Sequence, residues 1–113
     1  MAKRLDLSQG TLDLLIFKAV SLGPLDGCGV LQRIQQITAD HLHIQQGSLY
    51  PALYKLEHQG WIASQWGESD SNQKAKYFRW TASGRRALQT ETEYWDKMTS
   101  AIATVLHAMP EGV

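Results

Sequence analysis

Two short aromatic-rich segments restrict the fold of this chain more than any other feature. They are WIASQW at 61–66 and KYFRW at 76–80, and the polar stretch GESDSNQKA at 67–75 separates them. Aromatic runs bounded by polar turn residues are typical of strands, so the pair predicts a β-hairpin with a long tip. The other segments show helical rather than alternating periodicity.

Two amphipathic helices are expected near the start of the chain. Residues 8–22 place apolar side chains at the i, i+3, i+4, i+7 spacing of one helix face, and Ser8 is the expected N-cap. Residues 26–38 carry a similar stripe, with Asp26 as the expected N-cap. Both helices therefore have one side suited to a common core.

A third helix is expected at 48–59, directly before the first strand. Ser48 is a natural N-cap, Pro51 falls in the first turn where its missing N–H costs nothing, and Gly60 marks the end. Four apolar side chains share one side of this helix and form its expected buried stripe: Leu49, Ala52, Leu53 and Leu56.

A long last helix is expected after Thr81, continuing to about Met109 and stopped by Pro110. Its length would be on the order of 40 Å, which exceeds what the preceding body needs to cover itself. We therefore divide the chain into a body, residues 1–80, and a C-terminal dimerisation helix, residues 81–113.

The predicted fold class is mainly α with a small β-hairpin. Three helices followed by a hairpin are the order of a winged helix-turn-helix, in which the third helix enters the DNA major groove. Residues 1–80 are therefore expected to form a winged helix-turn-helix DNA-binding domain. Ser and Tyr hydroxyls suit phosphate oxygens, and Lys and Gln suit base edges. The candidate DNA-binding residues here are Gln45, Gln46, Ser48, Tyr50, Pro51, Tyr54 and Lys55. The alternative is an ordinary surface helix with two exposed tyrosines.

The hairpin adds basic and aromatic residues beside the third helix. Lys74, Lys76 and Tyr77 are the candidate DNA contacts of the returning arm, because phosphates attract Lys. Glu68 and Asp70 lie nearer the tip and would repel phosphate. The alternative is therefore a solvated turn of mixed charge.

The last helix carries a heptad pattern. Its apolar residues recur at steps of seven, three and four, as in the seam of a coiled coil. The candidate dimer-interface residues are Leu88, Trp95, Met98, Ile102, Val105 and Met109. A twofold dimer would present two recognition helices to half-sites roughly 34 Å apart. The alternative is that this helix folds back over its own three-helix core.

Trp95 is a bulky residue for a coiled-coil seam. Paired Trp95 rings can hold a flat aromatic effector between protomers, although plain interface packing is the simpler interpretation. A small aromatic effector is therefore the one small-molecule ligand that the sequence suggests.

Charge and cysteine content restrict the function classes. The formal net charge is zero, but residues 1–90 carry ten Lys and Arg against seven Asp and Glu, and residues 91–113 carry one against four. A mildly basic body thus precedes an acidic tail. The single Cys28 forms no internal disulfide and favours a reducing, cytoplasmic setting, at the nucleoid for a DNA-binding protein. A half-buried packing role is the expectation for this thiol.

Catalytic and cofactor motifs are absent from the sequence. It holds no Gly-rich phosphate loop, nucleophile elbow or clustered acid pair. HLH at 41–43 could hold a metal only with more ligands, which no nearby Cys or paired carboxylate supplies. No apolar run is long enough to span a membrane. We expect no enzyme activity, metal, cofactor or membrane partner, and we expect double-stranded DNA with a palindromic operator and a second copy of the chain as partners.

Three stretches resemble the PadR family of bacterial transcriptional regulators: GTLDLLIFKAVSLGPLDGCGV, GSLYPALYKLEHQGWI and KAKYFRWTASGRRAL. The likeness covers about residues 5–90, and the single C-terminal helix is similar to the smaller branch of that family. The positions that match the family's recognition-helix, wing and last-helix motifs are Ser48, Tyr50, Pro51, Lys55, Lys76, Tyr77, Thr81 and Gly84.

The resemblance implies a homodimeric winged-helix repressor that binds an inverted repeat in a promoter and that a small molecule can release. Asp26 stands where the family often has His, and Cys28 stands where it has an aromatic residue; Asp26 would repel a phosphate there. The competing hypothesis is a winged-helix protein–protein adaptor without DNA binding, which the zero net charge favours. Salt-dependent protection of promoter DNA separates the two hypotheses.

Overall fold

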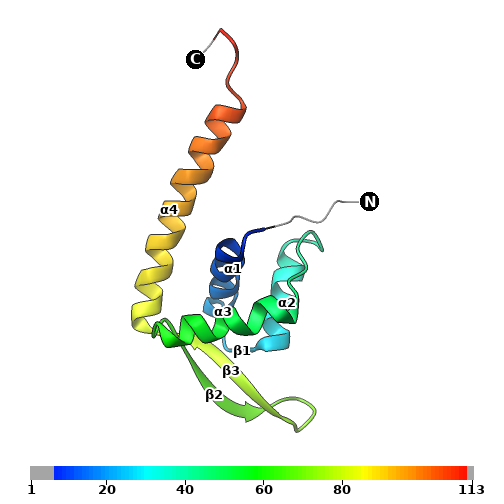
Figure 1. Cartoon of the computed structure of the whole chain (residues 1–113). Coiled ribbons are helices and arrows are strands. Elements are labelled where there is room, and N and C mark those ends of the chain that lie inside the picture. Colours follow the sequence, from blue (N-terminus) through cyan, green and yellow to red (C-terminus); the bar gives the residue numbers. More distant parts are fainter. Residues whose placement is uncertain (1–6, 112–113) are drawn as a thin grey trace.

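The computed structural model describes residues 7–111. The elements in chain order are α1 (Gln9–Ser21), β1 (Leu25–Asp26), α2 (Gly27–Ile37), α3 (Gln46–His58), β2 (Ile62–Glu68), β3 (Lys74–Trp80) and α4 (Ala82–Leu106). The first three helices form a cluster, the β2–β3 hairpin projects from it, and α4 rises away from it (Figure 1). The predicted class, mainly α with a winged helix-turn-helix, is confirmed.

The sheet has three antiparallel strands in the order β1-β3-β2. Strands β2 and β3 form the wing, and we call them the wing strands. They pair along their whole length, from Ile62 opposite Trp80 to Glu68 opposite Lys74. Both strands are longer, and the tip is shorter, than the sequence predicts. The sequence does not predict β1 either, because a strand of two residues shows no alternation; it forms by pairing Leu25 with the distant Phe78.

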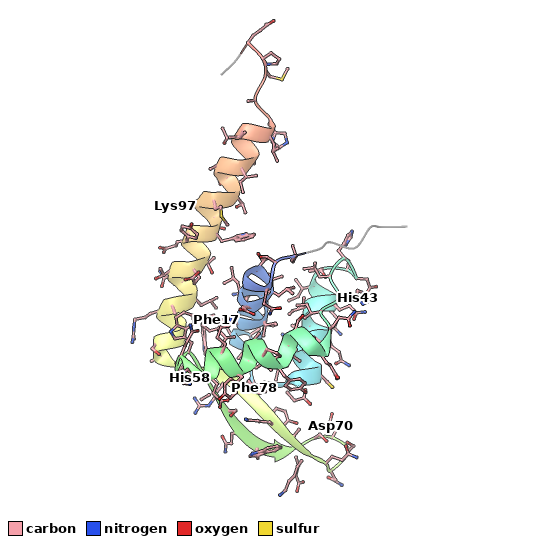
Figure 2. The ribbon with its side chains drawn as sticks, in the orientation of Figure 1. Phe17, His43, His58, Asp70, Phe78 and Lys97 are labelled. Atoms are coloured by element: carbon pink, nitrogen blue, oxygen red, sulfur yellow. The ribbon has the colours of Figure 1, made fainter. Side chains whose placement is uncertain are left out.

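One hydrophobic core lies between α1, α2, α3 and the sheet. The expected stripe of α3 is confirmed, because its four members are at most 3% exposed. Phe17 of α1 stacks on Trp61 with ring centroids 5.6 Å apart. Figure 2 labels Phe17 of α1 and Phe78 of β3, and both side chains belong to this core.

Three expected helix caps are present. The side-chain oxygens of Ser8, Asp26 and Thr81 accept hydrogen bonds from backbone N–H groups three residues later, at 3.3, 2.8 and 3.0 Å. Gly60 ends α3 with a φ of 77°, a backbone conformation that favours glycine. These caps fix where each helix begins or ends relative to the hairpin.

The predicted start of α3 is wrong by two residues. Gln45 is the N-cap, without a side-chain cap hydrogen bond, and the backbone N–H of Ser48 donates to the carbonyl oxygen of Gln45 at 2.9 Å. Ser48 is therefore a helical residue rather than the cap. Pro51 lies in the second turn and not in the first, so it deprives the carbonyl oxygen of Gly47 of the usual helical N–H donor.

The first half of α4 packs against the body of the protomer, and the second half, which we call its free half, extends away from that body. Leu88 is 4% exposed and packs in the core of its own protomer. Beyond Trp95 the helix extends away from the body, and Figure 2 shows Lys97 on this free part. The helix ends at Leu106, three residues before the predicted Met109. Among the helices within residues 7–111, none is long and apolar enough to cross a membrane.

Candidate nucleic-acid interface

The side of α3 that faces away from the core carries most of the candidate DNA contacts. Its exposed members are Gln45, Gln46, Tyr50, Pro51, Tyr54 and Lys55, with Ser48 half-buried. Tyr54 is 74% exposed, and its ring stacks on that of His58 one turn later with centroids 6.4 Å apart. Figure 2 shows His58 near the end of α3. Hydroxyls and planar rings along a free helix face can contact phosphates and base edges.

A surface hollow of about 300 Å³ joins α3 to the hairpin, and we call it the wing hollow. Its lining residues are Asp26, Gly27, Cys28, Tyr50, Trp66, Lys74, Ala75 and Lys76. The hydroxyl of Tyr50 lies so close to Gly27 that a Cβ atom there would be 2.6 Å from it. The wing hollow thus brings the recognition helix, the start of α2 and both wing strands to one surface.

Trp66 belongs to this surface, although the sequence reasoning does not select it. Its side chain is 66% exposed, and it lies on β2 opposite Lys76. An aromatic residue beside cations suits contact with sugars and bases. The only sequence signal is its place in an aromatic strand, which does not tell whether the ring faces the core or solvent.

The wing hollow also holds a carboxylate and a thiol. Asp26 caps α2 through the N–H of Gly29 and adds a negative charge beside Lys74 and Lys76. Cys28 is exposed, so the expectation of a half-buried packing thiol is wrong. The reason is that α2 turns Val30 and Ile34 to the core and leaves its first turn at the hollow. Within residues 7–111 no group of three or more His, Cys, Asp or Glu is arranged to hold a metal ion.

The cations of the predicted interface differ in how far they are neutralised. Lys74 is exposed and forms no ion pair with residues 7–111. The ammonium of Lys76 lies 3.8 Å from Glu57 Oε1, and Ser64 Oγ donates a hydrogen bond to the other oxygen of Glu57. Glu57 therefore ties α3 to both wing strands.

Lys55 leans toward α1. Its ammonium lies 2.6 Å from Asp13 Oδ2, 42 residues earlier in the chain. The helical wheel places Lys55 opposite the buried stripe, but the end of a long side chain can lie far from the direction of its own Cα. The ion pair with Asp13 therefore holds the Lys55 ammonium away from Lys74 and the wing hollow.

Tyr77 does not lie on the same surface as the other candidate DNA-binding residues. Neighbouring residues of a strand point to opposite sheet faces, so Tyr77 lies on the face opposite Lys76 and Phe78. Its hydroxyl donates to the carbonyl oxygen of Glu68 at 3.2 Å, and its ring lies over Gly67. Figure 2 shows Asp70 at the hairpin tip, away from α3.

A second hollow, of about 380 Å³, lies between α1 and α4, and we call it the α1–α4 groove. Its lining residues are Leu7, Thr11, Leu14, Leu15, Lys18, Leu42, Leu88, Thr92 and Trp95. Of the candidate dimer residues, Leu88 and Trp95 line this groove and Met98 is half-buried. Ile102, Val105 and Met109 are exposed farther along the chain.

Comparisons with known proteins identify the family. The model of the transcriptional regulator PadR-like family matches residues 16–90, more than half of the chain. An uncharacterized protein of Lysinibacillus sphaericus is 26% identical over 99 residues, which are 88% of this chain and 91% of that protein.

Solved structures agree with this match. A protein from Streptococcus mutans has a TM-score of 0.80 at 27% identity, over 92% of this chain and 93% of its own. A PadR family transcriptional regulator from Eggerthella lenta has a TM-score of 0.73 at 27% identity, over 89% of this chain and 86% of its own. The chain therefore belongs to the PadR-like family of transcriptional regulators, which are DNA-binding regulators and not enzymes.

Proposed function

We propose that this chain is a homodimeric repressor that binds an inverted-repeat operator in double-stranded DNA. The observation that carries the proposal is the wing hollow, because it joins the exposed face of α3 to the exposed Lys74 and Trp66 of the hairpin. In such an arrangement the helix can enter the DNA major groove while the basic hairpin contacts the DNA backbone. A repressor of this kind acts in the cytoplasm, at the nucleoid.

The contacts divide into two proposed kinds. Ser48, Tyr50, Pro51 and Tyr54 seat α3 on the DNA backbone, and Gln45 and Gln46 reach base edges from the start of the helix. Lys74 and Lys76 bind phosphates from the wing. Lys55 and Tyr77 lie at the margins of this surface, because Lys55 is paired with Asp13 and Tyr77 lies on the other sheet face.

The dimer is proposed to form along the free half of α4. The proposed interface residues are Trp95, Met98, Ile102 and Val105 on α4 and Met109 beyond its end, with Leu88 beneath them in the core of its own protomer. Exposed apolar residues along one helix are a liability for a monomer, and here they continue from the α1–α4 groove. A second copy can cover both surfaces through an isologous contact.

A small aromatic effector is proposed to bind beside Trp95. Support comes from the α1–α4 groove, because its volume of about 380 Å³ and its mostly apolar lining are typical of ligand pockets. Planar compounds titrated into the protein should quench its tryptophan fluorescence, and a Trp95→Phe variant should lose that response. No quenching across a broad panel of aromatics would contradict the effector proposal.

The repressor proposal is tested by footprinting DNA upstream of the chain's own gene. The purified protein should protect a twofold-symmetric site, and its affinity should fall steeply as salt rises. A Lys74→Ala variant should bind more weakly with a shallower salt dependence. Absence of protection at low salt would overturn the proposal and leave the protein–protein adaptor as the remaining hypothesis.

A further inference from the structure

The recognition helix is attached to α1 by a small polar network. The carboxylate of Asp13 binds the Lys55 ammonium through Oδ2 at 2.6 Å, and its Oδ1 accepts a hydrogen bond from Gln9 Nε2 at 2.8 Å. The same Gln9 nitrogen lies 3.5 Å from the carbonyl oxygen of Ser48. One carboxylate of α1 is thus connected directly to the last turn of α3 and, through Gln9, to the first turn of α3.

Asp13 is the more buried partner of this ion pair. The side chain of Asp13 is 13% exposed, whereas that of Lys55 is 55% exposed. Fully exposed ion pairs are screened by salt and stabilise little, but a partly buried partner is screened much less. Asp13 and Lys55 line a hollow of about 180 Å³ together with Glu91 of α4, so a second acidic side chain lies on the same hollow.

We propose that Asp13 is a positioning residue of the DNA-binding surface, which holds the charge of Lys55 against α1 and keeps it from acting as a free phosphate contact. The inference rests on the proposed DNA binding. Each free cation at such a surface adds affinity for any DNA, irrespective of sequence. By neutralising Lys55 and fixing the start of α3, Asp13 therefore favours the operator over other DNA.

The test compares salt dependence on operator DNA and on a scrambled duplex of equal length. Asp13→Asn removes the charge and keeps an acceptor for Gln9. It should bind the scrambled duplex several-fold more tightly. The salt slope, which is the slope of log affinity against log salt concentration, should be steeper by about one because one more phosphate is neutralised. The ratio of operator to scrambled affinity should fall. Asp13→Glu, which keeps the charge, should restore both quantities toward wild type.

Three further variants separate this role from a general change of charge or stability. Glu111→Gln changes the net charge equally at the far end of the chain and should leave slope and ratio unchanged. Lys55→Ala should weaken operator binding through the lost tether without changing the salt slope. Combined with Asp13→Asn, it should return the slope to the wild-type value.

These measurements distinguish a failure of this inference from a failure of the proposed DNA binding. An Asp13→Asn protein with the wild-type slope and ratio overturns this inference alone. A Lys55→Ala protein whose slope is shallower by about one also overturns it, because Lys55 would then be a free phosphate contact. A wild-type protein that binds no DNA at low salt overturns the proposed function and this inference together.

Discussion

The carbonyl oxygen of Trp61 lies so close to Gly84 that a Cβ atom at position 84 would be only 1.9 Å from it. The same oxygen accepts a hydrogen bond from the N–H of Thr81 at 3.0 Å, and the Thr81 hydroxyl donates to the carbonyl oxygen of Gly60 at 2.6 Å. The start of α4 is thus fixed on the turn between α3 and β2. This contact determines where the free half of α4 extends.

Gly84→Ala should destabilise the fold strongly. The obstructing atom is backbone and cannot rotate away, so α4 or the turn must shift, at a cost of about 3 kcal/mol. A thermal melt at fixed protein concentration should show a midpoint lower by roughly 10 °C or more. Gly10→Ala is the control, because a Cβ there meets no atom within 4 Å. Equal melting of the two variants would contradict the prediction.

Features that depend only on neighbouring residues are predicted well from this sequence. The stripe of α3 follows from helical periodicity alone, because burial depends on which side of the helix a residue occupies. The caps Ser8, Asp26 and Thr81 are equally local, since each needs only a side-chain oxygen three residues before a free N–H.

Contacts between distant segments are what the sequence reasoning misses. Strand β1 forms only because β3 offers it a partner, and the Asp13–Lys55 pair joins residues 42 positions apart. The start of α3 is misplaced for another reason. Ser48 is the better intrinsic cap, but the chain begins the helix at Gln46 with no capping side chain, against the local preference.

Gly27→Ala should weaken DNA binding without unfolding the protein. The added Cβ would lie 2.6 Å from the Tyr50 hydroxyl, which is the free end of a half-exposed side chain and can move aside. Stability should change by less than about 1 kcal/mol, whereas operator affinity should fall several-fold because Tyr50 leaves its proposed position. The measurement is a DNA titration beside a thermal melt.

Tyr50→Phe is the matched partner of that experiment. If Gly27 acts through the hydroxyl, Gly27→Ala should add little to the loss already caused by Tyr50→Phe. Additive losses in the double variant would show that Gly27 affects DNA binding by another route.

Asp26 should oppose DNA binding while it stabilises α2. Asp26→Asn keeps an oxygen that can accept from the Gly29 N–H and removes the negative charge beside Lys74 and Lys76. Its melting midpoint should stay near wild type, and its affinity at low salt should rise. Asp26→Ala removes the cap as well and should cost about 1 kcal/mol of folding free energy. Wild-type affinity in both variants would show that no phosphate approaches this position.

Ile102→Glu together with Val105→Glu should convert the proposed dimer into a folded monomer. Both side chains are exposed in the protomer, so charges there cost nothing until a second copy buries them. Sedimentation at micromolar concentration should show a halved mass, and helical circular dichroism should persist because the core contacts of Leu88 remain. Operator affinity should fall steeply, since each half-site would then bind a separate recognition helix without the linkage of the dimer.

Thr104→Glu is the control, because it adds a charge to the same exposed stretch of α4 but lies outside the heptad seam. A wild-type chain that sediments as a monomer, or a double variant that stays dimeric, would contradict the interface on α4.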